Sequence, residues 1–105
     1  MEKVIFKDAV LDYFDNLVYT LFKEEYFGFE ESAQNYKDKI VSFMISNISS
    51  FPHKKGPKSL QYLGSNYIFY KPNARTTWYV FFEKRDQNYL ITGIINNNSL
   101  EVKEL

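Results

Sequence analysis

A chain of 105 residues is long enough for a single hydrophobic core, and we expect one domain over residues 1–105. The absence of cysteine excludes a disulfide framework and a thiolate metal site, and a single histidine excludes a zinc site built on imidazoles. The net charge is zero, but residues 1–52 carry nine acidic and five basic side chains, whereas residues 53–105 carry eight basic and four acidic ones. This asymmetry predicts either a basic surface that meets an anionic partner or a solvated surface with segregated charges.

The sequence offers no sign of a leader, a membrane span or a cofactor site. No apolar run of signal-peptide length follows Met1, and none approaches the length of a membrane span. The four glycines do not form a phosphate-binding loop, and the paired glutamates of residues 24–25 and 30–31 are typical of solvated helix ends. We therefore expect a cytoplasmic protein without a membrane partner, a metal or a cofactor.

The N-terminal half is predicted to form a short strand and a helical hairpin. Residues 2–6 alternate in polarity as an edge strand does, and Asp8 then begins a stretch of apolar residues at helical spacing. Gly28 is placed to end this helix. A second helix begins near Glu30 and fades before Pro52. Because the link between the two helices is short, we expect them to be antiparallel.

The C-terminal half is predicted to form the sheet. Turn residues separate its four segments rich in β-branched and aromatic residues, which span 60–63, 67–71, 76–84 and 89–96. Connections this short favour antiparallel pairing. The tail, residues 97–105, is expected to be loose with at most one added turn or strand.

The segment 76–84 is apolar on both faces. By strand alternation, Trp78, Val80 and Phe82 share one face, and Thr77, Tyr79 and Phe81 share the other. One face is expected to pack on the helices, with Trp78 in the core, and the other needs cover from a partner. The predicted fold class is α+β, with an N-terminal short strand and a two-helix hairpin packed on a twisted antiparallel β-sheet of about four strands.

This order of elements resembles the RelE/ParE toxins, the toxin halves of bacterial type II toxin–antitoxin pairs. The resemblance covers nearly the whole chain, and its most specific parts are the hairpin corner at 26–33, the strand that begins at Arg75, and the closing Asn96 and Asn97. It implies a toxin that inhibits growth, takes part in functions such as plasmid stabilisation, and binds a cognate antitoxin protein.

One branch of this family cleaves messenger RNA on the ribosome without metal, as an mRNA interferase. Such an endoribonuclease needs a base that activates the ribose 2′-hydroxyl, cations that hold the extra negative charge, and an acid that protonates the leaving oxygen. The resemblance assigns catalysis to Arg75, His53 and Tyr70. It assigns RNA and phosphate binding to five further basic residues: Lys54, Lys55, Lys58, Lys71 and Arg85.

These assignments have plainer alternatives. His53 beside Pro52 is also typical of a surface loop, and the lysines at 54, 55 and 58 are typical of a solvated turn. Tyr67 and Tyr70 fall on opposite faces of a strand, so at most one of them can line a given site. Arg75 is the strongest candidate, because its rigid fork suits phosphate better than a lysine does.

Two non-catalytic functions also fit the resemblance. Nucleases of the family tend to carry basic residues at the positions of Ile68 and of Asn96 to Asn98, and neither isoleucine nor asparagine can replace them. A ParE-like inhibitor of DNA gyrase, or an attenuated toxin that only binds its antitoxin, needs no catalytic set. The expected partners are thus the antitoxin together with either the ribosome and mRNA or DNA gyrase, and a homodimer and a hetero-oligomer with the antitoxin both remain open.

Overall fold

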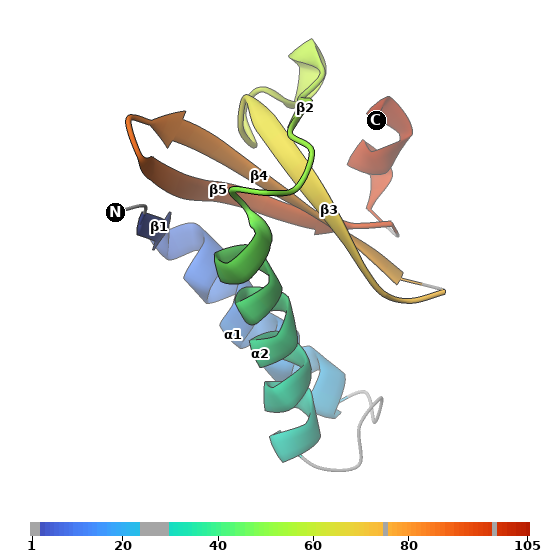
Figure 1. Cartoon of the computed structure of the whole chain (residues 1–105). Helices are drawn as coiled ribbons and strands as arrows, with labels where there is room; N and C mark the ends of the chain where they lie inside the picture. Colours follow the sequence, from blue (N-terminus) through green and yellow to red (C-terminus); the bar gives the residue numbers. More distant parts are fainter. Residues whose placement is uncertain (1–2, 24–29, 75, 98) are drawn as a thin grey trace.

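The computed structural model describes residues 3–23, 30–74, 76–97 and 99–105, and its fold is α+β, as predicted (Figure 1). The two α-helices lie side by side on one face of a twisted sheet. Neither described helix combines the length and apolar character needed to cross a membrane. Along the chain the elements are β1 (Lys3–Phe6), α1 (Asp8–Lys23), α2 (Glu30–Asn47), β2 (Lys54–Lys55), η1 (Lys58–Leu60), β3 (Asn66–Asn73), β4 (Thr76–Arg85), β5 (Asn88–Asn96) and η2 (Leu100–Glu104).

The sheet differs from the prediction in size and in pairing. It has five strands in the order β1-β5-β4-β3-β2, whereas about four antiparallel strands were expected. β3, β4 and β5 form the predicted antiparallel meander, and β2 adds an antiparallel edge. β1 pairs in parallel with β5, with Lys3 beside Asn88 and Phe6 beside Ile91. The helical hairpin is the crossover connection that allows this parallel pairing, so the sheet is mixed.

The predicted strand at 60–63 is wrong. The segment is instead the 3₁₀ turn η1 followed by a further turn, in which the amide of Leu60 donates to the carbonyl of Pro57 and that of Leu63 to the carbonyl of Leu60, both at 2.9 Å. Residues three apart lie on the same side of a 3₁₀ turn, so both leucines pack on the sheet. The C-terminal tail contains the single added turn that was allowed for, which is η2.

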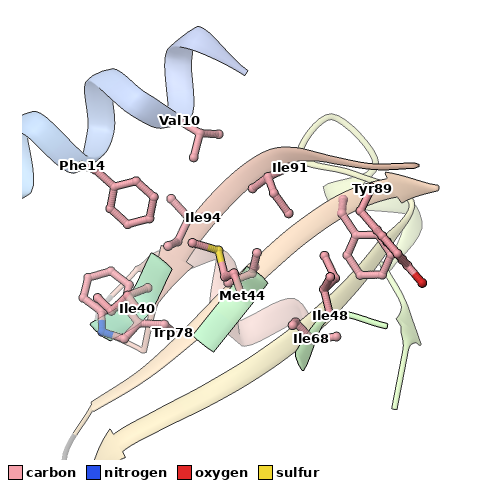
Figure 2. Packing of buried hydrophobic residues seen from close by; sticks show 12 residues of the cluster. Val10, Phe14, Ile40, Met44, Ile48, Ile68, Trp78, Tyr89, Ile91 and Ile94 are labelled. Carbon is pink, nitrogen blue, oxygen red and sulfur yellow. The ribbon is translucent and has the colours of Figure 1, made fainter. Parts of the chain in front are cut away.

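The main core lies between the helices and the sheet (Figure 2). Phe14 of α1 and Met44 of α2 are almost fully buried and belong to the same cluster as Trp78 and Ile91 of the sheet. Trp78 is 2% exposed, which confirms its predicted core position, and its indole N–H donates to the hydroxyl of Tyr36 at 3.0 Å. A buried indole N–H needs such a partner, so this bond ties α2 to β4.

The segments with η1 and η2 lie on the side of the sheet away from the helices (Figure 1), and a smaller cluster packs between them and the sheet. Leu60 of η1 and Val102 of η2 pack there with side chains that point away from the helices. The cover that was expected from a partner thus comes in part from the chain itself. The buried members of this cluster are Leu60, Tyr67, Phe81 and Ile95.

The segment that carries η1 is fixed closely against the sheet at Gly64. A Cβ atom on Gly64 would lie 2.6 Å from the Thr92 hydroxyl oxygen and 2.9 Å from the Phe82 backbone nitrogen, so only glycine allows the segment to come this near. The Thr92 hydroxyl donates to the carbonyl of Leu63. The Glu83 carboxylate accepts from the amide of Ser65 at 3.3 Å and from its hydroxyl at 2.9 Å. These contacts hold the segment between β2 and β3 in place.

Candidate functional site

A groove of about 330 Å³ lies on the sheet face that points away from the helices, and we call it the β3–β4 groove. Strands β2, β3 and β4 supply its floor, and the C-terminal segment that contains η2 supplies one wall. Its lining residues are Lys54, Tyr67, Phe69, Lys71, Thr77, Tyr79, Val102 and Leu105.

The floor of the groove is aromatic. The rings of Tyr67 and Tyr79 lie 6.1 Å apart between centroids, and those of Phe69 and Tyr79 lie 6.4 Å apart. Strand pairing explains the arrangement, because Phe69 of β3 lies directly opposite Tyr79 of β4, and alternate residues of β3 share this face. The floor therefore offers π-surfaces to a ligand that can stack.

Tyr67 is buried in this floor, and its pKa is raised by desolvation first and by the neighbouring Tyr79 second. Both causes disfavour the phenolate. Near neutral pH the Tyr67 hydroxyl is therefore a proton and hydrogen-bond donor rather than a base.

Two lysines give the groove its positive charge. The ammonium of Lys54 lies 5.8 Å from the centroid of the Phe69 ring, and Lys71 is exposed at the other end of the same face. Within the part of the chain that the structure describes, neither ammonium is paired with a carboxylate. Both remain available to an anionic ligand.

The start of β4 is held by Asn97, one of the asparagines at the end of the sheet. The amide of Thr77 donates to the Asn97 side-chain oxygen at 3.1 Å, and the amide of Asn97 donates to the Thr77 carbonyl at 3.0 Å. This reciprocal pair fixes Thr77 at the groove. The asparagine at this position thus has a structural role.

The structure brings only some of the predicted phosphate-binding residues together. Lys54 and Lys71 line the groove, whereas Lys55 points to the other side of the sheet by strand alternation and Lys58 lies exposed at the start of η1. Arg85 lies at the far end of β4, eight positions beyond Thr77, or roughly 26 Å at ~3.3 Å per residue. It cannot share a small ligand with Lys71.

The predicted catalytic residues His53 and Tyr70 lie on the helix side of the sheet. The ring of Tyr70 stacks on that of Phe43 in α2, with centroids 4.2 Å apart and planes 20° apart. The His53 imidazole N–H donates to the carbonyl of Ile48, and the ring meets Phe82 edge-on at 4.9 Å. Neither side chain reaches the groove, whose tyrosines are Tyr67 and Tyr79.

Arg75, the leading candidate, lies outside the described residues, and so does Gly28 with the hairpin corner before Glu30. The groove includes residues that were not predicted as site residues, namely Phe69, Thr77, Tyr79, Val102 and Leu105. Alternation from Tyr67 to Lys71 was a usable signal for Phe69, and cross-strand pairing then leads to Tyr79. No local pattern indicates that Val102 folds back onto the sheet.

The described residues contain no group of three or more side chains placed to hold a metal ion. Comparison with known proteins gives no match to a family model, to a curated protein or to a solved structure. The resemblance to the RelE/ParE toxins therefore stays a prediction from the sequence.

Proposed function

We propose that this chain is a RelE/ParE-like toxin of a type II toxin–antitoxin module and that its β3–β4 groove binds single-stranded RNA. The observation that carries the proposal is the pairing of two lysines, which have no carboxylate partner among the described residues, with an aromatic floor on the helix-free face. Cations that follow a phosphate backbone beside aromatic rings that stack on bases are the usual means of binding single strands. The predicted α+β fold with a helical hairpin on one face supports the same assignment.

We assign roles in RNA cleavage to residues of the groove. The ribose 2′-oxygen would attack the phosphate and form a cyclic phosphate while its proton passes to solvent water. Lys54 and Lys71 would contact that phosphate, and the Tyr67 phenol, which is protonated near neutral pH, would donate a proton to the leaving oxygen and regain one from water. Arg75 stays the predicted phosphate clamp. Tyr67 replaces Tyr70 in this scheme because Tyr70 stacks on Phe43 on the other face.

A non-catalytic inhibitor is the second candidate. The described lining of the groove contains no imidazole and no side-chain carboxylate, the groups that most often take a proton near neutral pH. This favours a protein that binds without cleaving, either a ParE-like inhibitor of DNA gyrase or a partner that only binds its antitoxin.

The first experiment separates these functions in cells. The protein is expressed from an inducible promoter while growth, transcript integrity and DNA supercoiling are followed. The proposal predicts growth arrest with cleaved transcripts. Arrest with intact transcripts and an SOS response would identify the gyrase inhibitor, and unimpaired growth would reject toxicity.

The second experiment tests the groove itself with purified protein. Affinity for an oligouridylate is measured at several salt concentrations for Lys54→Ala/Lys71→Ala and for a matched control, Lys37→Ala/Lys39→Ala, which removes the same charge from α2. Each lost phosphate contact lowers the slope of log affinity against log salt by about 0.7 for a single strand, so the groove variant should lose about 1.4. An unchanged slope, or an equal loss in the control, would reject the groove as the RNA site.

A third measurement tests the role of Tyr67. Tyr67→Phe keeps the ring and removes the proton donor, so it should lower cleavage by about 10²- to 10⁴-fold while RNA affinity stays close to that of the unmodified protein. Arg75→Ala is compared in parallel and should weaken binding as well. Cleavage that survives Tyr67→Phe would remove this tyrosine from the mechanism.

A further inference from the structure

One edge of the sheet is covered over only part of its length. β2 pairs with β3 through two residues, with Lys55 beside Asn66 and Lys54 beside Tyr67, whereas β3 continues to Asn73. In the described part of the chain, no strand lies outside β3 beyond Tyr67. The outer edge of β3 from Phe69 to Lys71 is therefore open.

The backbone groups on this edge point outward. The carbonyl of Ser65 accepts from the amide of Gly56 at 2.9 Å, on the side of β3 that faces away from β4. In an antiparallel sheet alternate residues bond to the same neighbour, so Tyr67 and Phe69 direct their N–H and C=O groups to that same side, and Lys71 follows at the register shift where the regular ladder ends. Tyr67 meets β2 there, while the outward groups of Phe69 have no backbone partner among the described residues.

The side chains beside this edge favour a negatively charged occupant. Phe69 and Lys71 project into the β3–β4 groove, and Lys54 stands at the end of β2, in line with the open position. Both ammonium groups lack a carboxylate partner in the described part of the chain. An occupant of the edge would thus meet two cations around an aromatic ring.

The open stretch of the β3 edge is also short, because regular pairing ends close to it. The pairing of β3 with β4 shifts register between Tyr70 and Asn73, and Pro72, which has no N–H, lies within that shift. A bulge and a proline are common means of ending strand pairing at an edge. Only a short extended segment fits between Lys54 and Pro72.

We propose that the open edge at Phe69 and Lys71 accepts a short, extended acidic peptide as an added strand, with its carboxylates on Lys71 and Lys54. A peptide supplies both donors and acceptors to the edge, which matches the outward N–H and C=O groups. The RNA backbone offers phosphate acceptors and, at the 2′-hydroxyl, a donor, but not the alternating N–H and C=O groups of a strand, so RNA satisfies the lysines without continuing the ladder. The inference rests on the proposed function for the origin of the peptide, which would be a segment of the antitoxin.

The test uses a short capped peptide that alternates glutamate and threonine. Binding should slow amide hydrogen exchange at Phe69 and leave the outer edge of β1, Lys3–Phe6, unprotected. The same peptide with N-methylated amides keeps its charges but cannot donate to the ladder, and it should bind at least tenfold more weakly. Equal binding of the methylated peptide, or no protection at Phe69, would overturn the proposal.

Charge and RNA provide two further comparisons. Lys71→Glu changes an exposed side chain, so the fold should be kept. The variant should bind the glutamate peptide more weakly and a lysine–threonine peptide more tightly. Each exposed ion pair that is lost or gained should change the affinity by up to about fivefold. Oligouridylate should protect the Phe69 amide less than the peptide does, because it forms no ladder of alternating donors and acceptors. Protection by RNA alone would overturn the peptide proposal. Peptide binding without RNA binding would support the peptide proposal and reject the RNA function.

Discussion

The two faces of the sheet differ in how much apolar surface they bury and in which side chains they leave near solvent. On the helix face, twelve described hydrophobic residues form one buried cluster, whereas four form the buried cluster of the opposite face. Burial of each large apolar side chain is worth about 1.5–3 kcal/mol, so the helix face contributes most of the stability. The opposite face can leave Lys54, Phe69, Lys71 and Tyr79 at an open groove.

The side chains of β4 project to both faces of the sheet. Trp78 and Val80 enter the main core, while Thr77, Tyr79 and Phe81 line the groove or the small cluster beside it. A rigid strand positions binding side chains more accurately than a loop does. The aromatic content of the chain thus serves stability on one face and ligand contact on the other.

The largest expected effect comes from the helix face. Phe14→Ala removes a ring that is 1% exposed and should lower the free energy of unfolding by about 3–5 kcal/mol. Leu11→Ala on the same helix is the control; this side chain is 46% exposed, and its loss should cost less than about 0.5 kcal/mol. Chemical denaturation measures both, and similar losses would contradict the position of the core.

A smaller effect is expected where the η1 segment meets the other face. Gly64→Ala places a methyl group within 2.9 Å of the Phe82 backbone nitrogen, so the segment must shift, at a cost of about 1–3 kcal/mol. The control is Tyr62→Ala in the adjoining turn, because this side chain is 71% exposed. If denaturation gives no loss for Gly64→Ala, the close contact with the sheet is wrong.

The smallest effect is a dependence on alkaline pH that involves one tyrosine on each face. Burial raises the pKa of Tyr13 above the usual 10.0, with a further contribution from Tyr36, and the pKa of Tyr67 is raised as well. Above pH 10.0 the unfolded chain loses these protons first, so the native state binds more protons and stability falls as pH rises. Tyr13→Phe should flatten this decline in denaturation curves measured on both sides of pH 10.0. A decline of the same steepness would show that Tyr13 does not cause it.

The sequence predicts the parts of the fold that depend on local pattern. Helical spacing from Asp8 predicts α1, and alternation through Trp78, Val80 and Phe82 predicts both β4 and its buried face. The parallel pairing of β1 could not be predicted, since it depends on where the helical hairpin returns the chain. β2 consists of Lys54 and Lys55, which carry no apolar signal at all.

The candidate site was predicted only in part, for a related reason. His53 and Lys54 are neighbours in sequence, but the chain passes from the helix layer to the sheet edge between them. One therefore contacts Ile48 and Phe82, and the other lines the groove. Residue type and proximity in sequence cannot reveal such a crossing.

Lysine acetylation footprinting tests the central claim most directly, because the protein carries lysines on both sides. The reactivity of each lysine is measured by mass spectrometry with and without oligouridylate. The proposed RNA site predicts that Lys54 and Lys71 become protected while Lys37 and Lys39 of α2 keep their reactivity. Protection of the α2 lysines, or equal protection of all four, would contradict the assignment of binding to the helix-free face.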